Sequence, residues 1–326
     1  MSESSIEFVP ATAEDYDEVM SFSGGIYNGT DYLPFRYHAW LKDHRRRMFL
    51  AKSEGKIVAF ESFLLVDDGK TAAAEALRVA PWMRGQGVAG LIQKFCLDVL
   101  RSEHQSAKRV RLTRTENPPP NMLKKYKVVH SKAFVSAIIS SDQLEEAINL
   151  LEGRVDNTRE STTYCILEPS EVLKLFDGTK TARELLPGRL LVQGWLPLTT
   201  QRSNLEMLFE RKIFWIYSKA YRTNVPLSSP TTDPAEFLSL GTPPYPVPYA
   251  DTTYRFDIDM FGTDPKCAKT HVLQQLKLCM QSLPAGAGLI CFMYAEESLR
   301  NELSDFCEGL TPFNRGKKQM ILEMEI

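Results

Sequence analysis

The fold is indicated most clearly by one stretch, Leu77-Arg-Val-Ala-Pro-Trp-Met-Arg84-Gly85-Gln86-Gly87-Val88-Ala89-Gly90. It joins a predicted strand over residues 72–79 to a predicted helix over 88–103, in which apolar side chains recur at helical spacing. Gly85 and Gly87 permit a tight turn with successive exposed N–H groups. Such a turn, together with the positive end of the helix, can hold a phosphate without a cationic side chain. The sequence therefore predicts a pyrophosphate-binding turn at residues 84–89.

Two other glycine-rich phosphate motifs do not fit this turn. A Walker A loop requires Lys followed by Ser or Thr after its last glycine, whereas Leu91 and Ile92 follow Gly90 here. A dinucleotide-binding motif would follow the first strand of its unit, with an acidic residue about 20 positions further on. Here the turn comes after a fourth strand, which itself follows a predicted hairpin. Both alternatives are therefore excluded.

Strand and helix patterns alternate through the first 140 residues. The predicted strands cover residues 6–9, 48–51, 57–66, 72–79, 109–115 and 128–139, and the predicted helices cover 14–23, 35–43 and 88–103. Thr12 is the expected N-cap of the first helix. Because a helix separates strand 72–79 from strand 109–115, we expect these two strands to run parallel. The pattern predicts an α/β fold with a mixed sheet.

The element order and the turn together resemble the GNAT family of N-acetyltransferases. Arg84-x-x-Gly-x-Ala89 matches the family's (Gln/Arg)-x-x-Gly-x-(Gly/Ala) signature. The preceding Leu-Arg-Val-Ala-Pro is similar to the Val-x-Pro segment that usually comes before this signature in the family. The resemblance implies acetyl-CoA as the donor, with no metal. It places the pantetheine arm beside Leu77 and Val79. The pyrophosphate would lie on the backbone of Arg84, Gly85, Gln86, Gly87, Val88 and Ala89.

The chain departs from the family pattern after the fifth strand. Many members carry Tyr-x-x-x-Gly-Phe there, whereas this chain has Asn117-Pro-Pro-Pro-Asn121-Met-Leu-Lys-Lys-Tyr126. If Tyr126 takes the Phe position, Asn121 occupies the usual Tyr position. We expect Asn117 and Asn121 to contact the cofactor. Protonation of the departing thiolate then falls to Tyr126, another tyrosine or solvent. Arg45-Arg46-Arg47 could reach the CoA 3′-phosphate, although a solvated charge run is the simpler interpretation.

Acetyl transfer to an amine requires a base, since an α-amino group has a pKa of about 8. Glu75 is the first candidate, acting directly or through a water. Strand periodicity places it on the same face as Val79, whose N–H the family uses to bind the oxyanion. Glu61 is the second candidate, because a carboxylate inside the apolar strand 57–66 must be either partnered or catalytic.

Two segments carry a narrower resemblance. Residues 23–34, together with Leu-Arg-Val-Ala-Pro-Trp at 77–82, look like the vertebrate members of this family that acetylate histidine. This resemblance alone implies L-histidine as the acceptor, acetylated on its α-amino group. We expect Tyr27 and Tyr32 to offer an aromatic surface to the imidazole ring, and Asp31 to pair with its N–H.

The carboxylate of a free amino acid calls for an arginine in the acceptor site. Arg78, Arg111 and Arg114 are near enough in the predicted strand order. We predict that Arg78 binds the substrate, but the sequence does not show which of the three arginines binds the carboxylate.

The second half repeats part of the pattern of the first. Strands are predicted over residues 190–195, 212–217, 253–260, 289–294 and 320–326, with helices over 268–283 and 296–310 and a proline-rich loop over 226–248. We therefore predict two tandem GNAT-like halves, a catalytic domain over 1–145 and a divergent domain over 146–326. At the position of the cofactor turn the second copy has Asp264 and Pro265 in place of paired glycines. It is expected to bind no acetyl-CoA and to complete the acceptor pocket. The pattern does not decide whether the halves share one sheet.

Composition limits the class of protein. The chain has 326 residues and a formal net charge of −2, which argues against a general nucleic-acid binder. No stretch approaches the roughly 20 apolar residues of a membrane span, and the N-terminus does not resemble a signal peptide. The six cysteines and five histidines show no metal-ligand spacing. We expect a cytoplasmic protein without a metal.

Two other functions remain open at this point. The chain could acetylate another amino acid or small amine, or it could be a regulator that binds acetyl-CoA without catalysis. A base at Glu75 favours the enzyme. The oligomeric state is not determined by the sequence.

Overall fold

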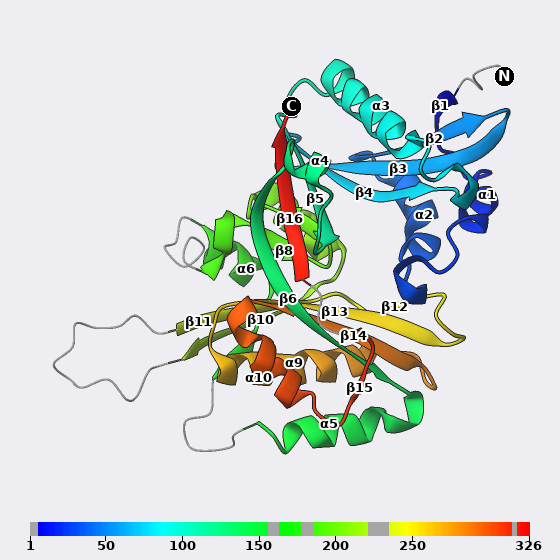
Figure 1. The fold of residues 1–326 in the computed structure, drawn as a ribbon. Coiled ribbons are helices and arrows are strands. Elements are labelled where there is room, and N and C mark those ends of the chain that lie inside the picture. The colour runs from blue at the N-terminus through cyan, green and yellow to red at the C-terminus, as the bar shows by residue number, and fades with distance from the viewer. Residues whose placement is uncertain (1–5, 156–162, 178–184, 221–234, 315–317) are drawn as a thin grey trace.

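One large sheet runs through the whole protein (Figure 1). The computed structural model describes residues 6–155, 163–177, 185–220, 235–314 and 318–326. The sheet has the strand order β1-β2-β3-β4-β5-β16-β6-β14-β13-β11-β10-β7, with β12 and β15 beside it and β8-β9 as a separate hairpin. The strands are β1 (Ile6–Pro10), β2 (Arg46–Ser53), β3 (Lys56–Val66), β4 (Thr71–Val79), β5 (Arg109–Thr115), β6 (Lys127–Ile139), β7 (Tyr164–Ile166), β8 (Leu191–Gln193), β9 (Leu196–Leu198), β10 (Phe214–Ala220), β11 (Ala235–Gly241), β12 (Tyr245–Pro246), β13 (Thr253–Phe261), β14 (Gly288–Ala295), β15 (Thr311–Pro312) and β16 (Lys318–Glu325).

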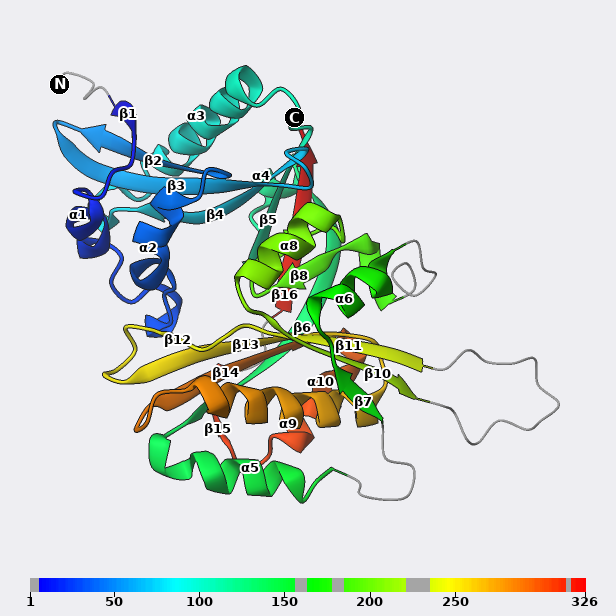
Figure 2. The same cartoon turned by 180° about the vertical axis from the view of Figure 1, so that it is seen from behind.

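Helices cover both faces of this sheet (Figure 2). They are α1 (Tyr16–Ser21), α2 (Leu33–Lys42), α3 (Val88–Glu103), α4 (Pro120–Leu123), α5 (Leu144–Glu152), α6 (Pro169–Phe176), α8 (Arg202–Glu210), α9 (Pro265–Ser282) and α10 (Arg300–Phe306). In the first half, α1 and α2 pack on one face and α3 on the other, each over its own apolar cluster. In the second half, α5, α9 and α10 cover one face. Helices α6 and α8 fill the angle between the halves.

The two halves exchange their last strands. Strand β16, at the end of the chain, pairs with β5 through Gln319–Glu325, while β6 pairs with β14 through Ala133–Ile139. Strands β16 and β6 also pair with each other. The halves are therefore joined by backbone hydrogen bonds into one sheet. Strand 318–325 comes from the segment assigned to the second domain, yet it lies between strands of residues 109–115 and 127–139.

The second half repeats the order of the first. Strands β10, β11 and β13, helix α9 and strand β14 follow in the same sequence as β2, β3, β4, α3 and β5. In both copies the strand before the long helix runs parallel to the strand after it, as β4 does with β5 and β13 does with β14. The prediction of an α/β fold with two similar halves is confirmed.

Several predicted elements are wrong in detail. The segment 190–195 is not one strand but the start of the β8-β9 hairpin, because Gly194, at φ 62°, turns the chain together with Trp195. The proline-rich segment contains a strand at Ala235–Gly241, which is the stretch without prolines. Residues 226–234 of that segment lie outside the described residues.

Helix ends also differ from expectation. The first helix starts after Asp15, whose carboxylate accepts hydrogen bonds at 2.8 Å from both the N–H and the hydroxyl of Thr12. Thr12 is therefore a donor in this turn and not the N-cap. The segment 296–310 forms a short 3₁₀ turn followed by α10, and α5, α6 and α8 were not predicted. In the part of the chain that the structure describes, no helix has the length and apolar composition needed to cross a bilayer.

Helix α8 and the turn after β3 tie the halves together. Asp67, at this turn, accepts hydrogen bonds from the side chains of Thr199 and Asn204 at 2.7 Å each. It also pairs with Arg111 of β5 at 2.5 Å, and Asn204 is itself buried. One carboxylate of the first half is thus bonded to two residues of the second half, at the start of α8, and this fixes the relative position of the halves.

Candidate functional site

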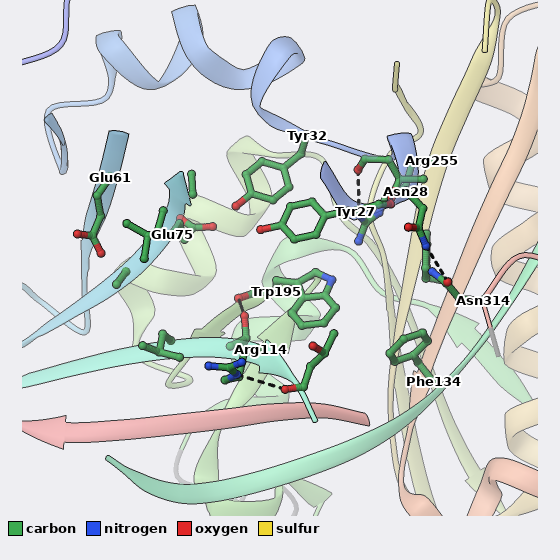
Figure 3. A pocket seen from close by; sticks show the side chains of 18 of the residues that line it. Tyr27, Asn28, Tyr32, Glu61, Glu75, Arg114, Phe134, Trp195, Arg255 and Asn314 are labelled. Atoms are coloured by element: carbon green, nitrogen blue, oxygen red, sulfur yellow. Dashed lines mark hydrogen bonds between the residues drawn. The ribbon is translucent and has the colours of Figure 1, made fainter. Parts of the chain in front are cut away.

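An opening between two parallel strands forms the site. Strands β4 and β5 are paired only from Thr71–Ala73 to Arg109–Arg111, and beyond this they separate. Residues 74–77 and 112–115 then line a cavity of about 400 Å³ between the two strands. On its outer edge β5 pairs with β16 over its whole length, so the opening does not break the sheet. This cavity is the candidate active site (Figure 3).

A β-bulge in β4 reverses the facing of its residues. Glu75 is level with Ser62 and Arg78 with Phe60, so two residues of β4, Ala76 and Leu77, lie opposite the single residue Glu61 of β3. Ala76 takes the extra position, with φ 64°. The alternation of faces therefore changes within the strand, and Glu75 and Val79 lie on opposite faces. The prediction that they share a face is wrong, because period-2 geometry holds only without a bulge.

Glu75 faces the side of α2 and lines the cavity. Its carboxylate forms an ion pair of 2.6 Å with Arg46, which also donates to the hydroxyl of Ser62 at 3.0 Å. The guanidinium of Arg46 is buried and stacks 3.6 Å from the ring centre of Trp40. The interpretation of residues 45–47 as a solvated charge run is thus wrong for Arg46, because strand alternation turns it inward. The guanidinium of Arg46 therefore holds one carboxylate oxygen of Glu75 in place.

Glu61 lies on the opposite face of the sheet, beneath α3. Its side chain is buried, and burial raises its pKa to about 8, although hydrogen bonds with Cys96 and Gln93 oppose the shift. One oxygen, Oε2, has no hydrogen-bond partner among the described residues. Glu61 lines the main cavity and also a smaller one of about 30 Å³ on its far side. A carboxylic acid that keeps its proton near neutral pH therefore borders the opening.

Tyr126 does not line the main cavity. It borders the smaller one together with Glu61, and burial and the negative charge of Glu61 raise its pKa to about 12. Asn117 and Asn121 are exposed and do not line the main cavity either. Their neighbour Met122, in α4, does line it, although it was not predicted.

The loop between α1 and α2 closes the cavity on the α2 side. Tyr27 and Tyr32 both line it, with ring centres 5.9 Å apart and nearly parallel. Figure 3 shows both hydroxyls pointing toward Glu75. Both predicted acceptor-binding aromatics are therefore brought to the same space as the predicted base.

Asp31 and Arg78 do not line this cavity. They form a buried ion pair with each other, and Asp31 also accepts the N–H of Leu33 at 3.0 Å. Arg78 donates to the carbonyl of Ala76 at 2.9 Å. The pair therefore fastens the start of α2 to the bulge in β4, and the charges of the two side chains are directed at each other.

The remaining walls come from the second half and its strand partners. They are Phe134 of β6, Trp195 at the tip of the β8-β9 hairpin, Arg255 of β13, Phe292 of β14 and Asn314. None of these was predicted. For Arg255 a signal existed, since charged residues recur along the otherwise apolar strand β13 at Arg255, Asp257 and Asp259. Trp195 and Asn314 carry no comparable signal.

Two contacts connect these walls to the loop between α1 and α2, residues 22–32, which we call the acceptor loop. Arg255 pairs with Asp257 at 2.8 Å and donates to the carbonyl of Thr30 at 3.2 Å. The side-chain amide of Asn28 donates to Asn314 at 3.0 Å, as Figure 3 shows. The second half thus holds the loop in place at the same points where it lines the cavity.

The glycine-rich turn lies at the end of β4 and is exposed. Gly85 and Gly87 have φ of 78° and 82°, a backbone region that residues other than glycine disfavour. Helix α3 begins directly after Gly87, and no side chain caps its first N–H groups. Arg84 folds back to donate to the carbonyl of Val79 at 3.1 Å. The turn therefore offers uncapped N–H groups to solvent directly after β4, the strand that borders the opening.

The backbone of Val79 also faces the opening. Ala80 donates its N–H to Val58 of β3 at 2.8 Å. Because N–H groups alternate in direction along a strand, the N–H of Val79 points away from β3 and toward the side of β5. A donor therefore lies on the edge of β4 that borders the gap.

The equivalent place in the second half is closed. Strands β13 and β14 stay paired from Thr253 to Asp259, so they do not separate. Asp264 caps α9 by accepting the N–H of Cys267 at 2.8 Å, and Pro265 occupies the first helical position. The helix end that is uncapped in the first half is therefore occupied by a carboxylate in the second.

Comparison with known proteins matches two segments of the chain to described families. Residues 12–122 match the family described as "Acetyltransferase (GNAT) family", and residues 160–296 match "Histidine N-acetyltransferase, C-terminal". The chain is 35% identical to "Probable N-acetyltransferase 16" of Homo sapiens, over 98% of this chain and 86% of that protein. It is 33% identical to "Histidine N-acetyltransferase" of Oreochromis niloticus, over 95% of this chain and 89% of that protein.

Solved structures resemble this fold over nearly the whole chain. A tandem GNAT protein from the clavulanic acid biosynthesis pathway has a TM-score of 0.58 at 13% identity, and the alignment covers 98% of both chains. A GCN5-related N-acetyltransferase from Sphaerobacter thermophilus has a TM-score of 0.57 at 11% identity, covering 98% of this chain and 95% of that one. At these identities the likeness concerns the fold.

Proposed function

The chain belongs to the histidine N-acetyltransferase family of GNAT proteins, and on that premise we propose that it moves an acetyl group from acetyl-CoA to the α-amino group of L-histidine, giving N-acetylhistidine and CoA. One observation carries the proposal. A cavity lies at the gap between β4 and β5 and is lined from both faces of the sheet, by Glu61 on the α3 face and by the tyrosines of the acceptor loop on the α2 face. The glycine-rich turn follows the end of β4, whose residue Leu77 lines this cavity. Donor and acceptor can therefore meet from opposite faces.

The turn would bind the pyrophosphate of acetyl-CoA. The uncapped N–H groups at the start of α3 and the left-handed glycines support this role, since both present backbone donors to an anion. The pantetheine arm would then follow the edge of β4, where Leu77 lines the cavity and the N–H of Val79 faces the gap. That N–H is our candidate for binding the oxyanion of the tetrahedral intermediate.

Glu75 is our candidate for the general base. It lies on the face that carries the acceptor loop, and it is fixed by Arg46 at 2.6 Å. In the proposed step the amine nitrogen of the acceptor bonds to the acetyl carbon, Glu75 takes a proton from this nitrogen, and the bond from carbon to sulfur breaks.

Glu61 is our candidate for the acid that returns a proton to the CoA thiolate. Burial raises its pKa to about 8, so that it is protonated at neutral pH, and it borders the cavity on the α3 face. A protonated carboxyl cannot act as a base, which favours Glu75 for that role. Tyr126 lies behind Glu61 at the smaller cavity, and we propose that it takes part only through Glu61.

The acceptor imidazole would lie among the aromatic side chains. Tyr27, Trp195, Phe134 and Phe292 border that part of the cavity, and the amides of Asn28 and Asn314 offer both donor and acceptor groups there. Because Trp195 and Phe292 belong to the second half, the predicted role of residues 146–326 in completing the acceptor pocket is retained as part of the proposal.

The proposal is tested by following release of CoA from acetyl-CoA with each free amino acid as acceptor, with the product identified by mass spectrometry. We expect turnover with L-histidine and little with the other amino acids. Preferred turnover with a different acceptor would contradict histidine as the substrate. Binding of acetyl-CoA without turnover on any acceptor would contradict catalysis and favour a regulator.

A further inference from the structure

An α-amino acid bound for acetylation brings a carboxylate to the reaction centre. This carboxylate is two bonds from the amine, so a cation that recognises it must lie beside the opening between β4 and β5. Among the described residues that line the cavity, two carry a permanent positive charge, Arg114 of β5 and Arg255 of β13. They differ in what they already bind.

Arg255 is fully engaged by the protein. Its Nε and Nη2 donate to Asp257 at 2.8–3.1 Å, Nη2 also contacts the hydroxyl of Tyr294 at 3.2 Å, and Nη1 donates to the carbonyl of Thr30. Its guanidinium lies 4.5 Å from the ring centre of Phe292. The charge of Arg255 is therefore neutralised, and its donors hold the acceptor loop.

The other two predicted arginines are also paired. Arg78 is bonded to Asp31 outside the cavity. Arg111 pairs with Asp67 at 2.5 Å and with Glu323 at 2.6 Å. Each of these guanidinium groups has a carboxylate of its own.

Arg114 has no such partner. Its contacts are the carbonyl of Thr115 and the sulfur of Met122, both at 3.4 Å, near the upper limit of a hydrogen bond. No carboxylate lies within ion-pair distance of it in the described part of the chain. The side chain is half-buried, and burial lowers its pKa, yet an arginine stays charged at any physiological pH. A partly desolvated cation without a counter-ion favours binding of an anion.

The position of Arg114 fits this role. It lies on the part of β5 beyond the last residue paired with β4, where the gap is open. Figure 3 shows its guanidinium below Trp195, across the cavity from Tyr27 and Tyr32. We propose that Arg114 binds the α-carboxylate of the acceptor and so selects α-amino acids over amines without a carboxylate. This inference rests on the proposed acetylation of an amino acid.

The test compares L-histidine with histamine, which has the same imidazole and amine but no carboxylate. We expect the wild-type protein to have a higher kcat/KM for histidine. Arg114→Met should lower that kcat/KM roughly 10- to 100-fold, mainly through KM, because a charged hydrogen-bond pair is lost. Its kcat/KM for histamine should stay unchanged. Arg114→Lys, which keeps the charge but not the planar fork, should recover part of the preference for histidine.

Arg109→Met is the matched control, since Arg109 lies on the same strand but is exposed, 3.7 Å from Glu323. The Arg109→Met variant should leave the kcat/KM for both histidine and histamine unchanged. An equal loss on histidine and histamine in Arg114→Met, or a rise in the KM for acetyl-CoA in place of the acceptor KM, would overturn the inference. So would a wild-type protein that acetylates both acceptors equally well.

Failure of the proposed function has a different signature. If the wild-type protein prefers another amino acid, histidine is wrong as the acceptor. The comparison is then made between that amino acid and its decarboxylated amine. If Arg114→Met loses the preference for the amino acid over its amine, Arg114 is still supported as the carboxylate-binding residue. If Arg114→Met keeps this preference, the inference about Arg114 is overturned.

Discussion

Glu61 and Glu75 line the same cavity from opposite faces of the sheet. Glu75 is level with Ser62 across the β3–β4 pairing, so Glu61, the residue before Ser62 in β3, points to the other side. One carboxyl is therefore buried beneath α3 and the other is paired with Arg46 beneath α2. This separation gives two carboxyl groups different surroundings at one reaction space, which an acid and a base acting together require.

Glu75→Gln tests the proposed base. The amide can still accept a hydrogen bond from Arg46, but it cannot take a proton. We expect kcat to fall by roughly 10²- to 10⁴-fold with the KM for acetyl-CoA unchanged. Steady-state kinetics from pH 6 to 9 would measure this, and thermal melting would confirm that the variant is folded.

Glu323→Gln is the control for Glu75→Gln, because Glu323 also pairs with a buried arginine, Arg111, at 2.6 Å, but lies outside the cavity. It should keep the wild-type kcat. If Glu75→Gln kept the wild-type rate at every pH, Glu75 would have no part in proton transfer.

Glu61→Gln tests the buried acid through stability. The pKa of Glu61 is about 8 in the folded protein, against about 4.3 for an exposed Glu. Below about pH 4.3, Glu61 is protonated in both the folded and the unfolded protein. As the pH rises from about 4.3 to about 8, the unfolded protein releases this proton and the folded protein keeps it, so the free energy of unfolding falls by at most about 1.4 kcal/mol per pH unit. Glutamine does not ionise. We therefore expect the melting temperature of Glu61→Gln, relative to the wild type, to rise from pH 5 to pH 8.

Glu103→Gln, at an exposed position of α3, should show no such trend. A difference between Glu61→Gln and the wild type that is the same at every pH would mean that Glu61 is ionised throughout. The wild-type kcat should also decline above about pH 8, as Glu61 loses its proton. This decline should disappear in Glu61→Gln, at a lower overall rate.

Gly87→Val tests the cofactor turn. Gly87 has φ 82°, so a β-branched residue there is strained by about 1–2 kcal/mol. The added side chain would also stand among the N–H groups proposed to hold the pyrophosphate. We expect calorimetry to show loss of acetyl-CoA binding by a protein that remains folded.

Gly55→Val separates strain from binding. Gly55, in the β2–β3 turn, has φ 77° and equally open surroundings, so it should cost similar stability and leave acetyl-CoA binding intact. If Gly87→Val bound acetyl-CoA as the wild type does, the turn could not be the pyrophosphate site.

Trp195→Ala tests the contribution of the second half. Trp195 lines the cavity and donates to the hydroxyl of Tyr294 at 3.0 Å. Loss of its ring should raise the KM for the acceptor by roughly 10-fold, the scale of one aromatic contact, without changing the KM for acetyl-CoA. Tyr164→Ala, a partly exposed aromatic of the second half outside the cavity, should change neither KM. An unchanged acceptor KM in Trp195→Ala would place the acceptor elsewhere.

Several of the residues that we expected at the site line the cavity, namely Tyr27, Tyr32, Glu61, Glu75 and Leu77. The role proposed for each remains a prediction. The pairing of Asp31 with Arg78 was missed because the two are distant in the sequence and either could equally have faced a ligand.

The turn at 84–89 and the helix over 88–103 could be predicted from the sequence alone, and the bounds of the helix agree with the structure. Both depend on interactions within a few residues, namely left-handed glycines and apolar side chains at helical spacing. Three features arise only in the folded chain: the bulge at Ala76, the insertion of β16 beside β5, and the cavity walls from Trp195 and Arg255. These depend on backbone pairing between segments up to about 200 residues apart. Such pairing leaves no local pattern, because any apolar strand can serve as the partner.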